Sequence, residues 1–378
     1  METAVYLGYS NIRCALGNST KEVFERIMQG DSGVKDGFAF LPERYASVED
    51  LVIPCIEEVL RSSGVSLQNN DTLLVISTTK GNVHLLGNNF IAKGDDCTVD
   101  CFPGVTARKI AANFNAANEP IVISNACISG ISALIIAKRL IASGQYSNVV
   151  VAGVDLLSPF IIEGFASFKS LSAERCRPYD ASHCGLNLGE GCGVVLLTDD
   201  SHRAAAPAVA ILGGSISNDA NHISGPSRTG DGLFYAMDKA ARNSGILLQN
   251  IDFINAHGTS TVYNDQMESK AVHWAGLDNR PLNSLKPYFG HTLGAAGVIE
   301  TILTAEQIRR GVILGTAGYN ENGVPFVLNV APEHRPAHIR YALKTASGFG
   351  GCNAALVLAA GTDDVGASGG SSTDSGNS

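Results

Sequence analysis

The stretch IVISNACISGISALIIAKRL, residues 121–140, decides the fold. Residues 120–124 are short and apolar, as in a strand covered on both faces, and residues 128–143 have a helical pattern. The two patterns meet within a few small residues around Cys127. A strand that passes directly into a helix is the unit of α/β folds. The stretch therefore predicts an α/β protein with a cysteine at the turn.

Similar segments recur along the chain. Glycine, with 41 residues, is found where apolar runs end, as short turns between strands and helices require. We expect sheets buried between helices. The predicted strands are 72–77, 148–153, 194–198, 251–256 and 354–360, and the predicted helices are 21–30, 128–143 and 293–311, the last with the stripe Leu293, Ala296, Ile299, Leu303 and Ile308.

Two segments of the chain resemble each other. Residues 121–137 and 341–359 each combine a strand, a turn of small residues and a second apolar segment. A duplicated α/β half would produce this likeness, and chance similarity between short apolar segments would produce it as well.

Two polar, Gly-rich stretches interrupt the pattern. Residues 213–232 predict a long loop that is functional, disordered or a boundary. Residues 361–378 contain one aliphatic residue, Val365, and predict a disordered tail outside the fold.

Charge and composition exclude several classes of protein. The 378 residues carry 27 Lys and Arg against 36 Asp and Glu, a formal charge of -9 without a basic run, so nucleic acid is not expected as a partner. No run of 18 apolar residues occurs and the first residues do not form a secretion signal, so we expect a cytoplasmic protein without membrane insertion. Nine scattered cysteines are then reduced and mostly buried thiols.

Cys127 is the first candidate for chemistry. At a turn that opens a helix, backbone N–H groups and the helix dipole favour a thiolate, so we expect an activated nucleophile. The alternative is a small buried cysteine without a catalytic role, which makes partner residues necessary.

Two histidines supply such partners. His257 lies at the C-terminal end of an apolar strand, which is where α/β sheets bind ligands. His291 precedes a Gly/Ala-rich helix. Lys286 lies shortly before His291, and Glu300 lies within the helix that follows it. Either histidine alone would be typical of a structural residue; together with Cys127 they indicate a site.

Other motifs carry less weight. GDSG at 30–33 lacks the upstream histidine of a serine protease, because the first histidine is His84. GEGCG at 189–193 precedes a strand rather than opening a helix, so it does not predict nicotinamide binding. Cys97, Cys101 and Cys184 beside His183 match no common zinc spacing and are interpreted as buried thiols.

Collinear motifs then point to a family. The sequence resembles β-ketoacyl synthases of the thiolase-like superfamily, in the branch with a Cys-His-His active site. The matching segments, in the order of the family, are NACISG (125–130), RPYD (177–180), GEGCG (189–193), NDANH (218–222), NAHGTST (255–261), NSLKPYFGHTLGAAG (283–297) and SGFGG (347–351). The resemblance implies a thiolase-like αβαβα sandwich of two similar halves, residues 1–205 with the nucleophile and 206–360 with both histidines.

The resemblance also implies roles for single residues. Cys127 matches the acyl-accepting nucleophile, and His257 and His291 match the pair that holds the carbonyl of the extender thioester. The remaining matches are Lys286 and Glu300 as a charged pair beside His291, Phe349 as the gating residue, Thr259 and Thr261 as hydroxyls that bind the phosphopantetheine arm, Phe165 as an aromatic lining of its tunnel, Lys169 at the tunnel mouth, and Ser224 in place of a common threonine.

The implied reaction explains these residue types. A decarboxylative Claisen condensation joins a Cys-bound acyl chain to malonyl-acyl-carrier protein, in fatty acid or polyene/polyketide synthesis. Cysteine is both nucleophile and leaving group, and two imidazole donors stabilise the charge that decarboxylation places on the thioester oxygen. No metal and no cofactor of its own is expected. The implied partners are acyl carrier protein, through its phosphopantetheine arm, and a second ketosynthase-like chain in a homodimer or heterodimer.

Several alternatives stay open. A thiolase would carry a second reactive cysteine near the C-terminus, and a ketosynthase III would carry asparagine in place of His291. A non-catalytic, chain-length-factor-like subunit of a heterodimer would usually lack Cys127. Lys80 and His84 fall where the family lines its acyl pocket, so they either point outward or accompany an unusual acyl group.

Overall fold

The computed structural model describes residues 3–85, 96–219, 221–222 and 225–361, with side chains omitted at 96–98. One sheet of ten strands runs through it in the order β10-β9-β13-β14-β8-β1-β7-β5-β3-β4. The strands are β1 (Val5–Cys14), β3 (Thr72–Ser77), β4 (Ile121–Ile123), β5 (Asn148–Asp155), β7 (Gly191–Thr198), β8 (Val209–Asn218), β9 (Phe253–Asn255), β10 (Leu282–Asn283), β13 (Tyr341–Gly348) and β14 (Cys352–Ala360).

The strand order repeats. From the centre outward, one half runs β1, β7, β5, β3, β4 and the other runs β8, β14, β13, β9, β10. In each half the first two pairings are antiparallel and the last two are parallel. The halves join through β1 and β8, where Val5 pairs with Ile211 and Tyr6 with Ala210. This repeat agrees with the duplication that the sequence allowed; the boundary at residues 205/206 stays a prediction.

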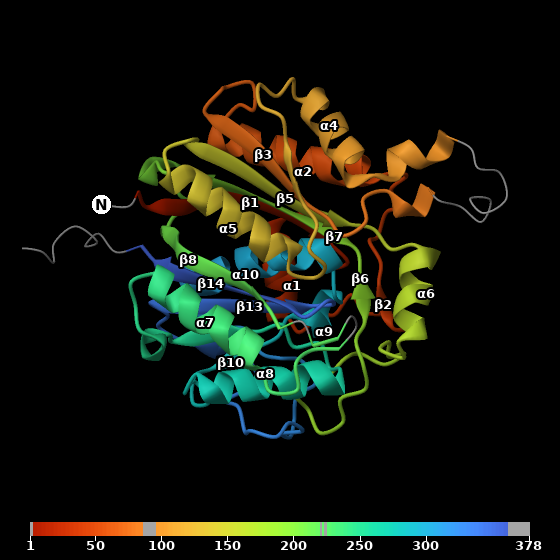
Figure 1. Ribbon diagram of the computed structural model, residues 1–378, viewed down its shortest axis with the longest axis vertical. Coiled ribbons are helices and arrows are strands. Elements are labelled where there is room, and N and C mark those ends of the chain that lie inside the picture. Colours follow the sequence, from red (N-terminus) through yellow and green to blue (C-terminus); the bar gives the residue numbers. More distant parts are fainter. Residues whose placement is uncertain (1–2, 86–95, 220, 223–224, 362–378) are drawn as a thin grey trace, which may run out of the picture.

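Helices cover and separate the two halves. Figure 1 shows α2 and α4 outside one half, α7 and α8 outside the other, and α5 with α10 between them. These layers form the expected αβαβα sandwich. The helices are α1 (Thr20–Met28), α2 (Val48–Ser63), α4 (Pro103–Asn113), α5 (Ser129–Ala142), α6 (Pro159–Ser167), α7 (Asp231–Asn243), α8 (Val262–Trp274), α9 (Lys286–Phe289) and α10 (Ala296–Arg310). Short pairs β2 (Phe38–Ala39) with β6 (Leu188–Gly189) and β11 (Val312–Ile313) with β12 (Arg335–Pro336) lie outside the main sheet.

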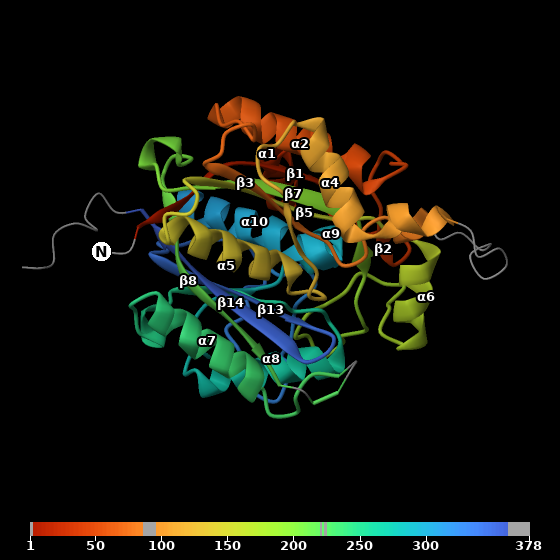
Figure 2. The same cartoon turned by 45° about the horizontal axis from the view of Figure 1, so that its top comes forward.

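The two central helices approach each other at glycines. Figure 2 shows α5 and α10 side by side between the sheet halves. A Cβ at Gly130 would lie 2.7 Å from the backbone nitrogen of Val298, and one at Gly297 would lie 2.5 Å from that of Ile131. Only glycine allows backbones to come this close. The contact brings the N-terminal ends of both helices, and hence Cys127 and His291, toward each other.

Local signals explain where several helices begin and end. Ser19, Ser47 and Ser158 each accept a hydrogen bond from a backbone N–H in the first turn of α1, α2 and α6. Such N-caps satisfy donors that the helix itself leaves unpaired. Gly64 ends α2 in a left-handed conformation, with φ of 67°.

The structure confirms the predicted strands and helices and corrects two details. Residues 213–218, predicted as part of a loop, belong to β8. The helix α10 is buried on all sides over most of its length, because polar Thr301, Thr304 and Gln307 are buried along with its apolar stripe. A helix enclosed between two sheet halves needs no solvent-facing side. The predicted tail falls outside the described residues from 362 onward.

In the part of the chain that the structure describes, no helix combines the length and the apolar character that a bilayer crossing demands.

Candidate active site

Cys127 lies in a constrained turn between β4 and α5. Ala126 adopts a φ of 44°, an uncommon conformation for a residue with a side chain. Ser129 holds the turn closed, since its hydroxyl donates to Ala126 O at 2.6 Å and accepts from Asn125 N at 2.8 Å. The Cys127 side chain is buried at the turn.

His257 is held by its backbone. It follows β9, and its N–H donates to Glu268 Oε1 at 2.9 Å while Gly258 N–H donates to Glu268 Oε2 at 2.7 Å. The His257 Nδ1 atom is buried and has no hydrogen-bond partner in the described structure. The ring is therefore placed by the loop and stays available to a substrate.

His291 is held through its ring as well. Its backbone N–H donates to Asn187 O at 2.7 Å, and its Nδ1 accepts from Leu293 N–H at 3.3 Å. Because Nδ1 is the acceptor, the proton of the neutral ring lies on Nε2. The Nε2 atom is buried without a partner in the described structure. His291 thus offers a hydrogen-bond donor and no lone pair.

The three side chains form one cluster. The Cys127 sulfur and one nitrogen of each histidine all lie within 4.8 Å of one another. The histidine rings are 5.1 Å apart, centroid to centroid, and nearly perpendicular at 84°. Within the described ranges this is the only group of three side chains that could also ligate a metal. The zinc arrangement of Cys101 with Cys184 and His183 is not formed, and the Cys97 side chain lies outside the description.

Burial sets the protonation of the cluster. It lowers the pKa of His257 well below its usual range and that of His291 to about 3, with the positive charge of Lys286 as the next cause in both. Both rings are therefore neutral near pH 7. Burial also raises the pKa of Cys127 to about 12. Loss of solvation thus opposes the thiolate that the helix N-terminus is expected to favour.

Behind the histidines lies a buried group of charges. Lys286 Nζ lies 2.7 Å from Glu300 Oε1, which confirms that the predicted pair is in contact. Lys344 Nζ lies 2.6 Å from Glu300 Oε2. All three side chains are almost fully buried, with exposures of 1% or less.

A pocket leads to the cluster. It has a volume of about 810 Å³ and is lined by Cys127, both histidines and most of the other predicted binding residues, namely Phe165, Lys169, Thr259, Thr261 and Phe349. Ser224 lies outside the described residues. Cys184 also lines the pocket and is exposed, which corrects its interpretation as a buried thiol.

Aromatic rings narrow the pocket. Phe349 stacks on Phe165 and meets Phe168 edge-on, with 5.3 Å between centroids in each pair. Thr259 Oγ1 and Thr261 Oγ1 are hydrogen-bonded at 2.8 Å. Apolar walls with a few hydroxyls suit a long, narrow substrate arm.

The sequence analysis missed two residues of the site. Lys344 is the one charged residue of the buried strand YALKTASG, which is a visible signal for a buried charge with a function or a partner. Glu268 lies in α8 and accepts from the backbone of His257 and Gly258 and from Tyr179 Oη at 2.8 Å. Glu268 lies 11 residues after His257 and outside the histidine motif, so no pattern in the sequence indicated this role.

The charges near the predicted acyl pocket point outward. Lys80 is exposed, and His84 Nε2 lies 2.8 Å from Ala46 O. The exposure of Lys80 agrees with the first of the two interpretations, and the preference for an unusual acyl group stays open.

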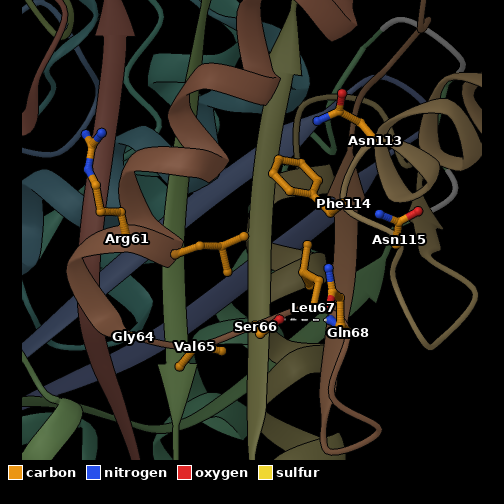
Figure 3. Close-up of a pocket in the computed structure, with 10 residues that line it drawn as sticks. Arg61, Gly64, Val65, Ser66, Leu67, Gln68, Asn113, Phe114 and Asn115 are labelled. Carbon is orange, nitrogen blue, oxygen red and sulfur yellow. Dashed lines mark hydrogen bonds between the residues drawn. The ribbon is translucent and has the colours of Figure 1, made fainter.

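A second hollow lies elsewhere. It is lined by the end of α2 and by residues 64–68 and 113–115, among them Arg61, Gln68 and Phe114 (Figure 3). It includes none of the clustered residues described above, so the chemistry belongs to the pocket at Cys127.

Comparisons with known proteins agree with this site. The family model described as "Beta-ketoacyl synthase, N-terminal domain" matches residues 43–203, and "Beta-ketoacyl synthase, C-terminal domain" matches residues 208–320. Together the two models cover the motifs that carry Cys127, His257 and His291.

Curated relatives share part or most of the chain. A 3-oxoacyl-(acyl-carrier-protein) synthase 2 of Rhizobium meliloti is 36% identical over 253 residues, which are 62% of this chain and 59% of the relative. A putative mitochondrial 3-oxoacyl-(acyl-carrier-protein) synthase of Schizosaccharomyces pombe is 34% identical over 64% of this chain and 61% of the relative. The matched stretch thus spans about three fifths of these relatives. A synthase 2 of Coxiella burnetii is 27% identical over 91% of this chain and 95% of its own.

Solved structures share the fold. A β-ketoacyl synthase from Burkholderia phymatum has a TM-score of 0.88 at 23% identity and covers 96% of this chain and all of its own. A ketosynthase in complex with its chain length factor, from Xenorhabdus doucetiae, has a TM-score of 0.81 at 25% identity over 95% of this chain and 98% of that one.

Proposed function

Because this chain belongs to the β-ketoacyl synthase family, we propose that it condenses a Cys127-bound acyl chain with malonyl-acyl-carrier protein. The product is β-ketoacyl-acyl-carrier protein and the by-product is CO2, in fatty acid or polyene/polyketide synthesis. The observation that carries the proposal is the contact of Cys127, His257 and His291 at one end of the pocket. A nucleophile beside two neutral imidazoles suits both halves of the reaction.

The first half-reaction is acyl transfer. The Cys127 sulfur attacks the acyl thioester, and the phosphopantetheine thiol of the carrier leaves as the new thioester forms. Since the pKa of Cys127 is about 12, its proton must move to a base as the sulfur attacks. His257 is neutral and its ring has no partner in the described structure, so it can accept that proton.

The second half-reaction is decarboxylation and condensation. Loss of CO2 from the malonyl group places negative charge on the thioester oxygen, and the carbon nucleophile then attacks the acyl-Cys127 carbonyl. His291 is suited to stabilise that oxygen, since its Nε2 carries the proton and lacks a partner in the described structure. A donor held in place before the reaction needs no reorganisation when the charge appears.

The partners follow from the pocket and from the relatives. We assign Thr259, Thr261 and Phe165 to the phosphopantetheine arm, Phe349 to the gate, and acyl carrier protein as the partner that brings the arm. No resident cofactor or metal is proposed, and the compartment is the cytoplasm. A second ketosynthase-like chain, identical or not, is proposed because β4 is an edge strand of the main sheet and pairs on that side with no other strand among the described residues.

The rival function is that of a non-catalytic partner subunit. The Xenorhabdus structure joins a ketosynthase to its chain length factor, so such subunits share this fold. Cys127 at the end of the pocket argues against that role here. Two other enzymes of the superfamily also fit less well. A thiolase would have a second reactive cysteine in a CxGxG context, which the chain lacks, and a ketosynthase III would have asparagine where the chain has His291.

The deciding experiment supplies acyl carrier proteins of graded acyl length together with malonyl-carrier protein. Mass spectrometry follows acyl mass on the protein and product mass on the carrier. Condensation with any acyl length supports the proposal. A folded protein that is neither acylated nor produces β-ketoacyl carrier would support the partner subunit instead.

The acylated residue provides a further test. We expect a trapped acyl group on Cys127 alone among the nine cysteines, mapped by peptide mass spectrometry. Cys352 is the informative comparison, because its sulfur and the Cys127 backbone both border Gly348. Acylation at Cys352 would contradict the assignment of the nucleophile.

A further inference from the structure

Lys344 is a buried cation to which the reaction as written assigns no task. It lies in β13, its side chain has an exposure of 0%, and the residues on either side of it, Leu343 and Thr345, are buried as well. An ammonium group in such a place loses its hydration, and the free-energy cost of that loss is large unless charged or polar partners compensate it. A lysine is therefore costly here and calls for an explanation.

Lys344 has one ion-pair partner and two hydrogen-bond acceptors. Nζ lies 2.6 Å from Glu300 Oε2 in the ion pair, and it donates to Thr345 O at 2.8 Å and to Ala256 O at 3.5 Å. A carboxylate and two carbonyl oxygens around one nitrogen suit the protonated amine, which has only donors. Ala256 immediately precedes His257, which places the positive charge directly behind the backbone of that histidine.

Lys344 changes the charge balance of the group behind the site. Glu300 already forms a pair with Lys286 through its other oxygen. One carboxylate between two ammonium groups leaves a net charge of +1 for the three side chains. Both lysines contribute to the lowered pKa of His257 and of His291. A neutral Lys286–Glu300 pair would exert a weaker effect.

We propose that Lys344 is a positioning residue, which adds a second positive charge beside Glu300 that keeps both histidines neutral and favours negative charge on the malonyl thioester oxygen. The inference rests on the proposed function and names a residue that acts through Glu300 and the histidines without touching the substrate. Fixed charge in a site closed to water is worth more than the same charge in solution.

The inference predicts a pH dependence. Burial is the main cause that lowers the pKa of Lys344 to about 8. Lys286 lowers this pKa further, whereas Glu300 and Glu268 raise it. Facing it are Glu300 from α10, Lys286 from α9, Glu268 from α8, and both histidines. Decarboxylation should therefore be fastest below pH 8 and fall as the pH rises through about 8, where Lys344 loses its proton.

The test compares Lys344→Met with the parent in malonyl-carrier-protein decarboxylation. We expect kcat to fall ~10-fold, KM to change less than ~2-fold, and the decline near pH 8 to disappear. Adding Glu300→Gln to Lys344→Met leaves Lys286 as a lone cation and should restore part of the rate. Lys138→Met, a buried lysine on α5 outside this group, is the matched control and should keep the parent profile.

Opposite results would overturn the inference. These are an unchanged rate in Lys344→Met, a lower rate that keeps the decline near pH 8, or a double variant slower than the single one. Lys344→Gln, which keeps a donor for Thr345 O, replaces Lys344→Met if the latter does not fold, with the same expectations for rate and pH.

A readout without turnover separates this inference from the proposed function. Nitrogen NMR of labelled histidines should show the imidazole titrations of His257 and His291 shifted upward by ~1 pH unit or more in Lys344→Met. Unshifted titrations would contradict the role of Lys344 even in an active enzyme. If the parent never decarboxylates the malonyl thioester but Lys344→Met still shifts the histidine titrations upward, the proposed function is refuted and the electrostatic role of Lys344 is supported.

Discussion

The two histidines of the site differ in what their rings can do. His291 accepts a hydrogen bond from Leu293 N–H at Nδ1, which leaves a proton on Nε2. His257 has no such bond, and only its backbone is held, by Glu268. One ring is therefore a fixed donor and the other can give or take a proton. We therefore assign the acyl transfer step to His257 and the decarboxylation step to His291 as part of the proposed function.

We accordingly predict unequal effects of His291→Ala. Decarboxylation, followed as CO2 release, should fall ~100-fold to ~1000-fold, the usual cost of one oxyanion donor. Acylation of Cys127, followed as added mass, should fall far less, because His291 has no lone pair to take the thiol proton. His338→Ala, an exposed histidine, is the control. Normal decarboxylation combined with lost acylation would reverse the two assignments.

At the scale of elements, the crossing of α5 and α10 determines where the nucleophile lies relative to the histidines. Cys127 is followed by Ile128, the N-cap of α5. His291 lies five residues before the start of α10, and Glu300 lies within that helix. The helices touch at Gly130 and Gly297, where backbone meets backbone. Close packing of this kind transmits any separation of the helices directly to the site.

A single methyl group at this crossing should be enough to disturb it. In Gly297→Ala the added Cβ would lie 2.5 Å from Ile131 N, so the helices must separate. We expect unfolding free energy to fall by ~1 to 3 kcal/mol, measured by urea denaturation, with slower condensation.

The matched control is Gly164→Ala in α6, where a Cβ meets nothing within 4 Å. Alanine there should be neutral or stabilising by up to ~1 kcal/mol, as its helix propensity predicts. Equal stability of the two variants would show that the crossing tolerates a wider spacing than the structure has.

At the scale of the whole molecule, the two packed halves enclose ionisable groups that water would otherwise reach. His257, His291, Asp265 and Lys344 are all buried, and burial is the first cause of the shifted pKa of each. A shifted pKa makes folding depend on pH, with a sign set by the direction of the shift.

We predict that the stability of the parent relative to His291→Asn and relative to Asp265→Asn changes with pH in opposite directions. The pKa of His291 falls to about 3, so between pH ~6.5 and ~3 the unfolded chain binds the extra proton and acid destabilises the fold. The parent should lose up to ~1.4 kcal/mol per pH unit relative to His291→Asn in that window. The pKa of Asp265 is raised to about 7, so relative to Asp265→Asn the parent should lose stability as pH rises from ~4 to ~7.

Urea denaturation at several pH values measures both differences. Parallel pH profiles for the parent and His291→Asn would mean that His291 takes up its proton equally in the folded and unfolded states. The same trend in both variants would contradict the assigned direction of one shift.

The sequence by itself predicted several of the strands and helices and named the three clustered residues. Apolar runs such as residues 72–77 and 148–153 have a short range and a distinct composition, so their strands could be predicted from local pattern alone. Cys127, His257 and His291 could be named because each lies in a recognisable motif at the end of an element. The two similar halves were only suggested, by a likeness of residues 121–137 and 341–359 that chance similarity would also produce.

Only the tertiary structure decided how these residues behave. The pKa of Cys127 depends on burial by segments distant in sequence, and that burial opposes the thiolate expected from the local turn. The sharing of Glu300 by Lys286 and Lys344, and the support of His257 by Glu268, join residues from different elements. Solvation and Coulomb interactions act through space, so no local pattern along the chain contains them.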